Sequence, residues 1–219
     1  MDKLRLRFKK TGRAIYISHL DLMHTMQRGF SRAGYELRYS EGFNPHPLIS
    51  ILLPLSVGAS SVCELMDFRL KRDCDLTALP AELTAVLPEG LEIIEAYEPQ
   101  RKSAELKWLQ VEGVFEYDER PADKMAELLK EFYSGKEIVI SKRTKRGMGE
   151  SNIAEAIRSI DFTQDGNDVK ISAVISAQEP TLNPELLAEA LRQLLPEAAP
   201  DFAKFTRIET FDANMEIYR

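Results

Sequence analysis

The chain has few of the residues that build metal clusters. Its 219 residues include only two cysteines, Cys63 and Cys74, and three histidines. An iron–sulfur cluster usually needs at least three thiolates, and the two cysteines are eleven positions apart without Cys-x-x-Cys spacing. The histidines show no ligand spacing of the His-x-x-x-His kind. We therefore expect two reduced thiols, no metal site and no cofactor.

The sequence also lacks a long apolar run. The longest, residues 48–57, is interrupted by two serines and a proline, and a membrane span needs about 20 apolar residues. The first ten residues, MDKLRLRFKK, alternate charged and apolar side chains and contain no apolar segment of the signal-peptide kind. With 44% hydrophobic and 29% charged residues, the composition is typical of a globular protein. These features predict a cytoplasmic protein without a membrane partner.

Two families of catalytic motif are missing as well. The Walker phosphate-binding pattern is absent. There is no Ser/His/Asp order and no nucleophile elbow, so the sequence gives no support to acyl transfer. The net charge of −6 argues against nucleic acid as a partner, but the charge is unevenly distributed. Residues 1–50 hold nine Lys or Arg and four Asp or Glu, a local charge of +5, so the rest carries −11. Such asymmetry favours one basic face on an acidic body, and the alternative is scattered solvated charge.

The first half of the chain alternates strand-like and helical patterns. Residues 3–9 alternate with period two, which predicts a strand. Residues 18–34 predict a helix with Ser18 as N-cap, Asp21 in a capping-box position and Gly34 as C-terminal cap. Its core-facing stripe is predicted to consist of Leu20, Met23, Met26, Phe30 and Ala33. Strands are expected at 35–39, 48–55, 63–71 and 91–98, with a short helix at 75–87.

The second half repeats this order without visible sequence repetition. A polar, proline-containing stretch at 98–105 predicts the boundary. Beyond it we expect strands at 106–117, 137–142, 167–176 and 205–211, helices at 121–135 and 183–195, a basic loop at 144–151 and a turn leading into a strand at 152–162. The prediction is an α+β fold of two tandem ferredoxin-like (βαββαβ-type) halves with antiparallel sheets, the first with one added strand, and with domains 1–99 and 100–219.

Residues 40–47, SEGFNPHP, predict a stiff loop. Gly42 and Asn44 tolerate backbone angles closed to most residues, and the two prolines restrict the residues before them to extended conformations. A stiff loop can hold Phe43, Asn44 and His46 in fixed positions, as a binding site requires. The alternative is a hairpin whose Phe43 fills the core and whose His46 has no role.

The predicted start of the first helix offers a candidate general base. His19 falls in the first turn, just after Tyr16 and Ser18, where the positive end of the helix dipole lowers imidazole basicity and attracts anions such as phosphate. A neutral His19 beside a phosphodiester is a candidate base, with His46 as a second acid–base partner. The alternative is an ordinary histidine at the surface of a helix cap.

Two basic segments are candidate phosphate ligands. On the first helix, Asp21, His24, Arg28 and Arg32 follow one another at i, i+3, i+7 and i+11 and form a polar stripe. Residues 142–151, KRTKRGMGES, resemble an arginine-rich contact to nucleic-acid phosphates. For both segments, the alternative is a solvated surface.

The run YISHLDLMHTMQRGFSRAGYELRYSEGFNPHPLISILLPLSVG, residues 16–58, resembles the opening of the radical-SAM-linked protein family. That bacterial family is a domain of unknown function fused to, or encoded beside, B12-binding-type radical SAM proteins. The matching motifs are YISHLDL, the arginine-bearing helix to Gly34, and YSEGFNPHP. His24, where a basic residue is expected, and Gly29 inside the helix depart from the pattern. The resemblance implies a radical SAM enzyme as partner, often with a link to RNA processing.

We therefore expect a non-catalytic accessory protein that binds or presents RNA for a radical SAM enzyme. The predicted contact residues are Tyr16, Ser18, His19, Arg28, Arg32, Phe43, Asn44, His46, Lys142, Arg143, Lys145 and Arg146. Two alternatives stay open: a metal-independent endoribonuclease that uses His19 and His46, and a protein–protein adaptor whose loop binds the enzyme.

Overall fold

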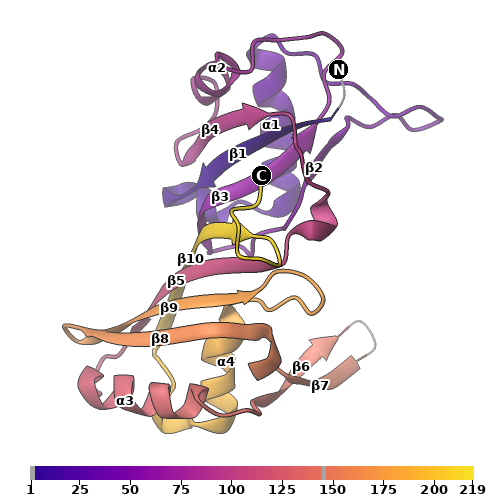
Figure 1. Ribbon diagram of the computed structural model, residues 1–219. Coiled ribbons are helices and arrows are strands. Elements are labelled where there is room, and N and C mark those ends of the chain that lie inside the picture. Colours follow the sequence, from indigo (N-terminus) through magenta and orange to yellow (C-terminus); the bar gives the residue numbers. More distant parts are fainter. Residues whose placement is uncertain (1–2, 145–146) are drawn as a thin grey trace. The chain divides into compact units, whose positions relative to one another are not determined.

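Figure 1 shows a computed structural model of the chain, which describes residues 3–144 and 147–219, with the backbone alone for Arg143 and Thr144. The chain divides into two compact units. The first contains the residues up to Ser103 together with Arg219, and the second is Ala104–Tyr218. Each combines helices with mostly antiparallel strands, so the predicted α+β class is confirmed.

The first unit contains a sheet with the strand order β4-β1-β3-β2. All neighbouring strands are antiparallel, and β2 pairs with only the last residues of β3, where Ile49 lies opposite Phe68. The strands are β1 (Leu4–Lys10), β2 (Ile49–Ile51), β3 (Ser60–Phe68) and β4 (Leu91–Tyr97).

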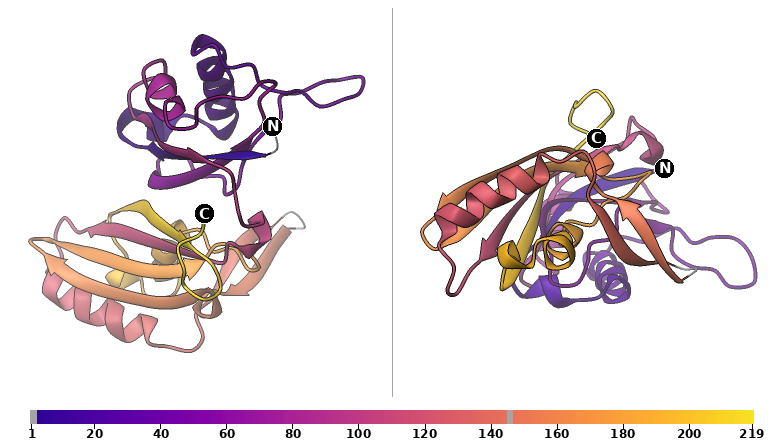
Figure 2. Two further views of the ribbon diagram at one scale, coloured as in Figure 1. Left: turned by 45° about the horizontal axis from the view of Figure 1, so that its top comes forward. Right: turned by 90° about the horizontal axis from the view of Figure 1, so that it is seen from below.

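Two helices, α1 (His19–Arg32) and α2 (Leu79–Thr84), cover one face of this sheet (Figures 1 and 2). Period-two alternation in β1 places Leu4, Leu6 and Phe8 in the core that they share with both helices. These side chains are almost wholly removed from water, so burial of apolar area attaches the helices to the sheet.

Helix α1 begins and ends where the sequence predicts. The hydroxyl of Ser18 accepts a hydrogen bond from the backbone N–H of Asp21 at 3.1 Å and donates one to its carboxylate at 2.7 Å. The helix ends at Arg32, and Gly34 follows with a left-handed φ of +82°.

The predicted core-facing stripe of α1 is partly wrong. Leu20 is 68% exposed, and the buried residues are Leu22, Met26, Gly29 and Phe30. Those four follow one another at i, i+4, i+7 and i+8, whereas Leu20 precedes the stripe by two residues and therefore points away from it. Gly29 belongs to this face because a Cβ there would lie 2.8 Å from the side chain of Leu87.

Two predicted strands of the first unit are absent or shorter than expected. The described structure has only isolated bridges in the predicted strand at 35–39, from Leu37 to Leu70 and from Tyr39 to Pro47. Proline has no backbone N–H to donate, so Pro45 and Pro47 interrupt any regular ladder here. The predicted strand at 48–55 is reduced to β2, and the helix expected at 75–87 is confined to α2.

The second unit contains a sheet with the order β10-β5-β9-β8, again with antiparallel neighbours. Helices α3 (Ala122–Tyr133) and α4 (Glu185–Leu194) lie against this sheet (Figure 2), and the rings of Tyr133 and Phe162 lie 5.3 Å apart in the core. Apart from an inserted hairpin, the strands connect in the same order as in the first unit. The strands are β5 (Trp108–Glu116), β8 (Ile157–Asp165), β9 (Asp168–Ser176) and β10 (Phe202–Phe211).

The predicted basic loop at 144–151 is for the most part a strand. β6 (Val139–Thr144) and β7 (Gly147–Asn152) pair as an antiparallel hairpin, inserted between α3 and a short 3₁₀ turn, Ala154–Ala156, that leads into β8. The hairpin is ordered by tertiary contacts that the local sequence does not reveal. Ile140 is buried, and the amide of Gln193 on α4 both accepts from the N–H and donates to the carbonyl of Ser141, each at 2.9 Å.

No helix within residues 3–144 and 147–219 is long and apolar enough to cross a bilayer.

Candidate functional site

A narrow ribbon, residues 38–48, projects from the first unit (Figures 1 and 2) and contains the SEGFNPHP motif. Its two arms are joined by backbone hydrogen bonds from Ser40 N–H to His46 O and from Leu48 N–H to Arg38 O, each at 2.8 Å. The Ser40 hydroxyl also accepts from the backbone N–H of His46 at 3.1 Å and lies 2.9 Å from its Nδ1. The imidazole is thereby fixed at the base of the ribbon.

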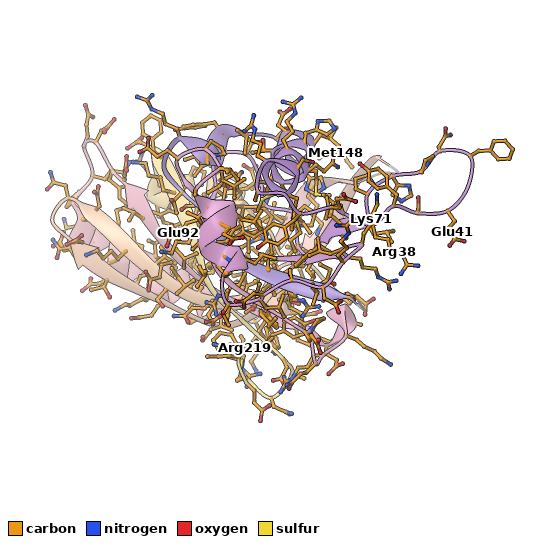
Figure 3. All side chains as sticks on the ribbon, turned by 90° about the horizontal axis from the view of Figure 1, so that it is seen from above. Arg38, Glu41, Lys71, Glu92, Met148 and Arg219 are labelled. Carbon is orange, nitrogen blue, oxygen red and sulfur yellow. The ribbon has the colours of Figure 1, made fainter. Side chains whose placement is uncertain are left out.

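The outer part of the ribbon is open to solvent. The side chain of Phe43 is fully exposed, at 106% of the reference area, and Asn44 and His46 are exposed too. In Figure 3, Glu41 lies out along the ribbon, away from Arg38 near its base. Phe43 is therefore not a core residue, so the part of the hairpin alternative in which it fills the core is wrong.

A groove of about 670 Å³ lies at the end of α1, beside the base of the ribbon. Arg28 and Arg32 line it from the last turns of α1, where cations also suit the negative end of the helix dipole. Being four residues apart, the two arginines share one helix face, opposite the buried stripe. The segment after the helix supplies Tyr35 and Tyr39, and Lys71 comes from beyond β3. We refer to these five residues as the basic groove.

Backbone pairing brings Lys71 to the groove. The N–H of Lys71 donates to the carbonyl of Glu36 at 2.9 Å, and the N–H of Arg38 donates to the carbonyl of Arg69 at 2.8 Å. Lys71 and Arg38 accordingly lie close together near the base of the ribbon in Figure 3. The Lys71 ammonium also pairs with the Glu36 carboxylate at 3.2 Å, but both side chains are more than half exposed, so this pair is weak.

Among residues 3–142 and 147–219, the guanidinium groups around the groove form no structural ion pair. Within the described part of the chain, Arg28, Arg32, Arg38 and Arg69 have no acidic partner. The phenol of Tyr35, in contrast, donates a hydrogen bond to the Glu82 carboxylate. Burial and this hydrogen bond raise the pKa of Tyr35 above its usual value, so its hydroxyl stays neutral at physiological pH. The groove therefore has a surplus of positive charge available to a ligand.

Sequence reasoning missed part of this groove. Lys71, Tyr35 and Tyr39 were not among the predicted contact residues, although a signal existed. Residues 68–72, FRLKR, place three cations in four positions directly after a buried strand. A cluster of cations at a strand end is a candidate surface site, and this cluster contains both Lys71 and Arg69.

The opposite end of α1 presents His19. Buried Lys10 donates from Nζ to the carbonyls of Ile15 at 3.1 Å and Ile17 at 3.2 Å, which holds the segment that leads into the helix. Tyr16 and His19 are exposed on this segment. His19 and the last helical residue are thirteen positions apart, about 20 Å at ~1.5 Å per residue, so His19 is not part of the groove.

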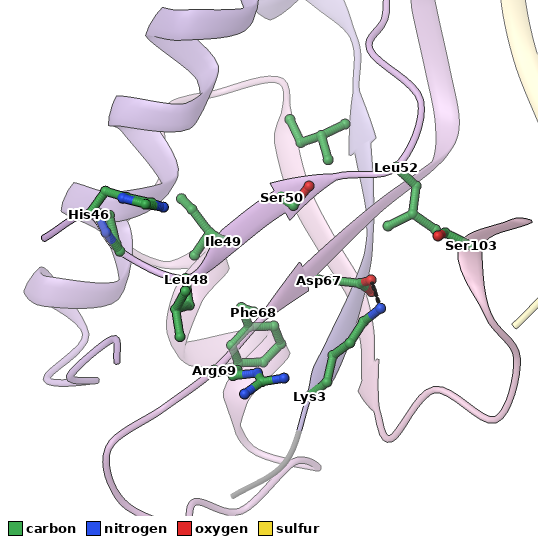
Figure 4. Close-up of a pocket in the computed structure, with 12 residues that line it drawn as sticks. Lys3, His46, Leu48, Ile49, Ser50, Leu52, Asp67, Phe68, Arg69 and Ser103 are labelled. Atoms are coloured by element: carbon green, nitrogen blue, oxygen red, sulfur yellow. Dashed lines mark ion pairs between the residues drawn. The ribbon is translucent and has the colours of Figure 1, made fainter. Parts of the chain in front are cut away.

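His46 lines a second pocket of about 560 Å³, between the base of the ribbon and the sheet (Figure 4). Lys3 and Arg69 line it as well, and Lys3 pairs with Asp67 at 2.5 Å. Asp67 also accepts from Nε of Arg5 at 2.6 Å, and Arg5 is wholly buried. His19 lines neither this pocket nor the groove, so the two candidate acid–base histidines are not brought into one described pocket.

The basic hairpin is only partly described. Lys142 is half-buried on β6, and for Arg143 the backbone alone is given. Lys145 and Arg146 lie outside the described residues. Lys142 and Arg143 belong to the second unit, whereas the groove and the ribbon belong to the first.

Among the described residues, no three His, Cys, Asp or Glu side chains are placed to hold a metal ion. Cys63 is buried and Cys74 half-buried, and neither is joined in a disulfide within the described part of the chain. Burial, followed by nearby acidic groups, raises the pKa of Cys74, so this thiol is not activated as a nucleophile.

The fold and the groove together define a two-unit α+β protein with a basic, aromatic-flanked groove beside a projecting ribbon. The chain belongs to the bacterial family described as "Uncharacterized protein conserved in bacteria (DUF2344)", which matches residues 3–209. No curated protein matches it.

Among solved structures, the chain is similar to one in the "Crystal Structure of a Cbf5-Nop10-Gar1 Complex". The two are 14% identical with a TM-score of 0.49, and the match covers 94% of this chain and 48% of the other. This chain thus spans about half the length of the solved chain.

Proposed function

We propose that this chain is a non-catalytic accessory protein of the bacterial cytoplasm that binds RNA for a radical SAM enzyme. The observation that carries the proposal is the basic groove, where Arg28 and Arg32 meet Lys71 and two tyrosines. The resemblance of residues 16–58 to the radical-SAM-linked family is the reason for proposing a radical SAM enzyme as the partner.

The chemistry of the groove suits a phosphodiester chain. A guanidinium offers a planar fork of donors that matches phosphate oxygens. Arg28 and Arg32 have no acidic partner among the described residues, so both are available for that contact. Phosphate contacts give affinity without sequence preference, whereas neighbouring tyrosines give surfaces on which bases stack. Arg38 and Arg69, also without an acidic partner in the described structure, extend the positive surface toward the ribbon.

The strand orders support a further proposal about the fold. Taken in their own numbering, both units connect four antiparallel strands in the spatial order fourth, first, third, second, with two helices against the sheet. We propose that they are two tandem ferredoxin-like halves, 1–99 and 100–219. Four-stranded sheets of this kind occur in RNA-binding modules, but that comparison is an analogy of fold and not of site.

The remaining predicted contacts are assigned secondary roles in this proposal. Tyr16, Ser18 and His19 form a separate patch at the other end of α1, and Asn44 and His46 flank the ribbon tip and its base. The cations of the hairpin, Lys142, Arg143, Lys145 and Arg146, are proposed as additional phosphate ligands.

The test is RNA binding by the full chain across a salt series in EDTA. For single strands, log K falls with log salt by about 0.7 per phosphate contact, so losing two contacts flattens the slope by about 1.4. We expect this change for the double variant Arg28→Ala/Arg32→Ala. Lys124→Ala/Lys136→Ala is the matched control, because it removes two exposed cations of the second unit and should leave the slope unchanged.

Equal slopes for the two double variants would refute the groove as the binding site, and absence of binding at low salt would refute the whole proposal. The RNA is examined on a gel after each titration. Cleaved RNA would favour a nuclease and make His19→Ala the next variant. If RNA is neither bound nor cut while a radical SAM enzyme co-purifies after nuclease treatment, the adaptor alternative is correct.

A further inference from the structure

The ribbon combines two exposed aromatic side chains with a sharp division of charge. Phe43 is fully exposed in the outer part and Tyr39, at the base, is 51% exposed. Residues 40–48 contain one acid, Glu41, and no Lys or Arg, whereas Arg38 and the basic groove lie at the base. The tip is therefore unsuited to phosphate, and the base is suited to it.

We propose that the ribbon stacks on unpaired bases, so that the protein selects single-stranded RNA over duplex. This inference rests on the proposed function and names its substrate class. Phosphates lie along the groove and at the base of the ribbon, while bases turned away from them stack on Phe43 and Tyr39. In a duplex the faces of the bases are covered by their neighbours, so a ring at the ribbon tip finds no surface to stack on.

The conformation of the ribbon supports this role. Its two arms are tied by backbone hydrogen bonds, and the serine–histidine pair at its base fixes the direction in which the outer part extends. Two prolines reduce the number of conformations that the free loop can adopt. Little conformational entropy is then lost when a base stacks on Phe43, which makes the ring an effective contact.

The dimensions fit a short segment of strand. Tyr39 and Phe43 are four residues apart, at most about 13 Å along an extended chain at ~3.3 Å per residue. Stacked bases follow one another at about 3.4 Å, so the two rings bracket a few nucleotides. Because stacking accepts every base, we expect weak sequence preference.

The test compares three labelled probes of equal phosphate number by fluorescence anisotropy. They are a single-stranded RNA, a strand that carries abasic sites throughout, and a duplex. For the single strand, Phe43→Ala should weaken binding by about 5- to 150-fold, the range that alanine substitution of a stacking side chain produces. For the abasic strand and the duplex it should have no effect. Phe202→Ala, which removes a 62% exposed phenylalanine of the second unit, is the matched control and should bind all three probes as the wild type does.

The outcomes separate the inference from the proposed function. If Phe43→Ala weakens all three probes equally, or none, while Arg28→Ala/Arg32→Ala weakens them all, the groove binds phosphates and the stacking inference is wrong. If the wild-type protein binds no probe, the proposed function fails as well. If Phe43→Ala leaves RNA binding intact but abolishes co-purification of the enzyme partner, the ribbon is a protein contact and the inference is overturned.

Discussion

Replacing Gly90 by alanine tests how closely the chain after α2 approaches the segment that leads into α1. Gly90 has a φ of +90°, and a Cβ there would lie 2.2 Å from the carbonyl oxygen of Thr11 and 3.0 Å from the Cβ of Ala14. The N–H of Thr11 donates to the carbonyl of Gly90 at 2.8 Å, so the overlap is at a backbone contact that cannot move without breaking this bond.

The expected loss of stability has two parts, and a second glycine separates them. Gly58 has almost the same φ, +91°, but nothing lies within 4 Å of a Cβ there. Gly58→Ala should therefore show only the left-handed penalty, about 1–2 kcal/mol of unfolding free energy. Gly90→Ala should show the same penalty plus an overlap penalty of about 1–3 kcal/mol, a total of about 2–5 kcal/mol.

Urea unfolding of the two variants beside the wild type measures this difference. The comparison is valid where the dependence of the free energy on urea is the same for all three proteins, because that slope reports the surface exposed on unfolding. Equal losses at the two positions would show that the contact between Gly90 and Thr11 is looser than described, and the reasoning from the close approach would fail.

Two further predictions concern the hairpin and an alkaline limit of stability. Gln193→Ala removes both hydrogen bonds to the Ser141 backbone. The loss should lower the local stability of the hairpin by about 1–2 kcal/mol and so speed amide hydrogen exchange of its described residues by about 5- to 30-fold. Unchanged exchange would show that Gln193 does not anchor the hairpin. Burial raises the pKa of Tyr97 to about 12. Between about pH 10 and 12 the folded protein therefore keeps a phenol proton that the unfolded chain loses. The free energy of unfolding should fall as the pH rises through this range. Tyr97→Phe should reduce that fall, and an identical pH dependence in the variant would contradict the assignment.

The limits of α1 follow from its sequence because capping is a local interaction. The hydroxyl of Ser18 accepts a hydrogen bond from the N–H of Asp21, three residues later. Gly34 can adopt its left-handed conformation whichever surface the helix packs against. The buried face depends instead on which partner the helix meets. Leu20 fits a helical stripe in the sequence, yet the stripe that meets the sheet begins at Leu22.

The residues of the candidate site also differ in whether local sequence predicts them. Arg28 and Arg32 were found in the sequence because helical spacing places them on one face. Lys71 and Tyr39 join them only through the pairing of two segments more than thirty residues apart, which no local pattern records. The ribbon is predictable only in part. Its glycine and two prolines predict a stiff loop, but the exposure of Phe43 depends on the tertiary structure.

The positions of the two motifs limit the size of a common ligand. The YISHLDL motif lies at the start of α1, and the groove and ribbon lie at its end, with His19 and Arg32 about 20 Å apart along the axis. At about 3.4 Å per stacked nucleotide, that distance corresponds to about six nucleotides. A mononucleotide or a small cofactor reaches one end only. If one ligand is responsible for both motifs, it is a polymer, and if the ligand is small, His19 serves a different purpose from the arginines.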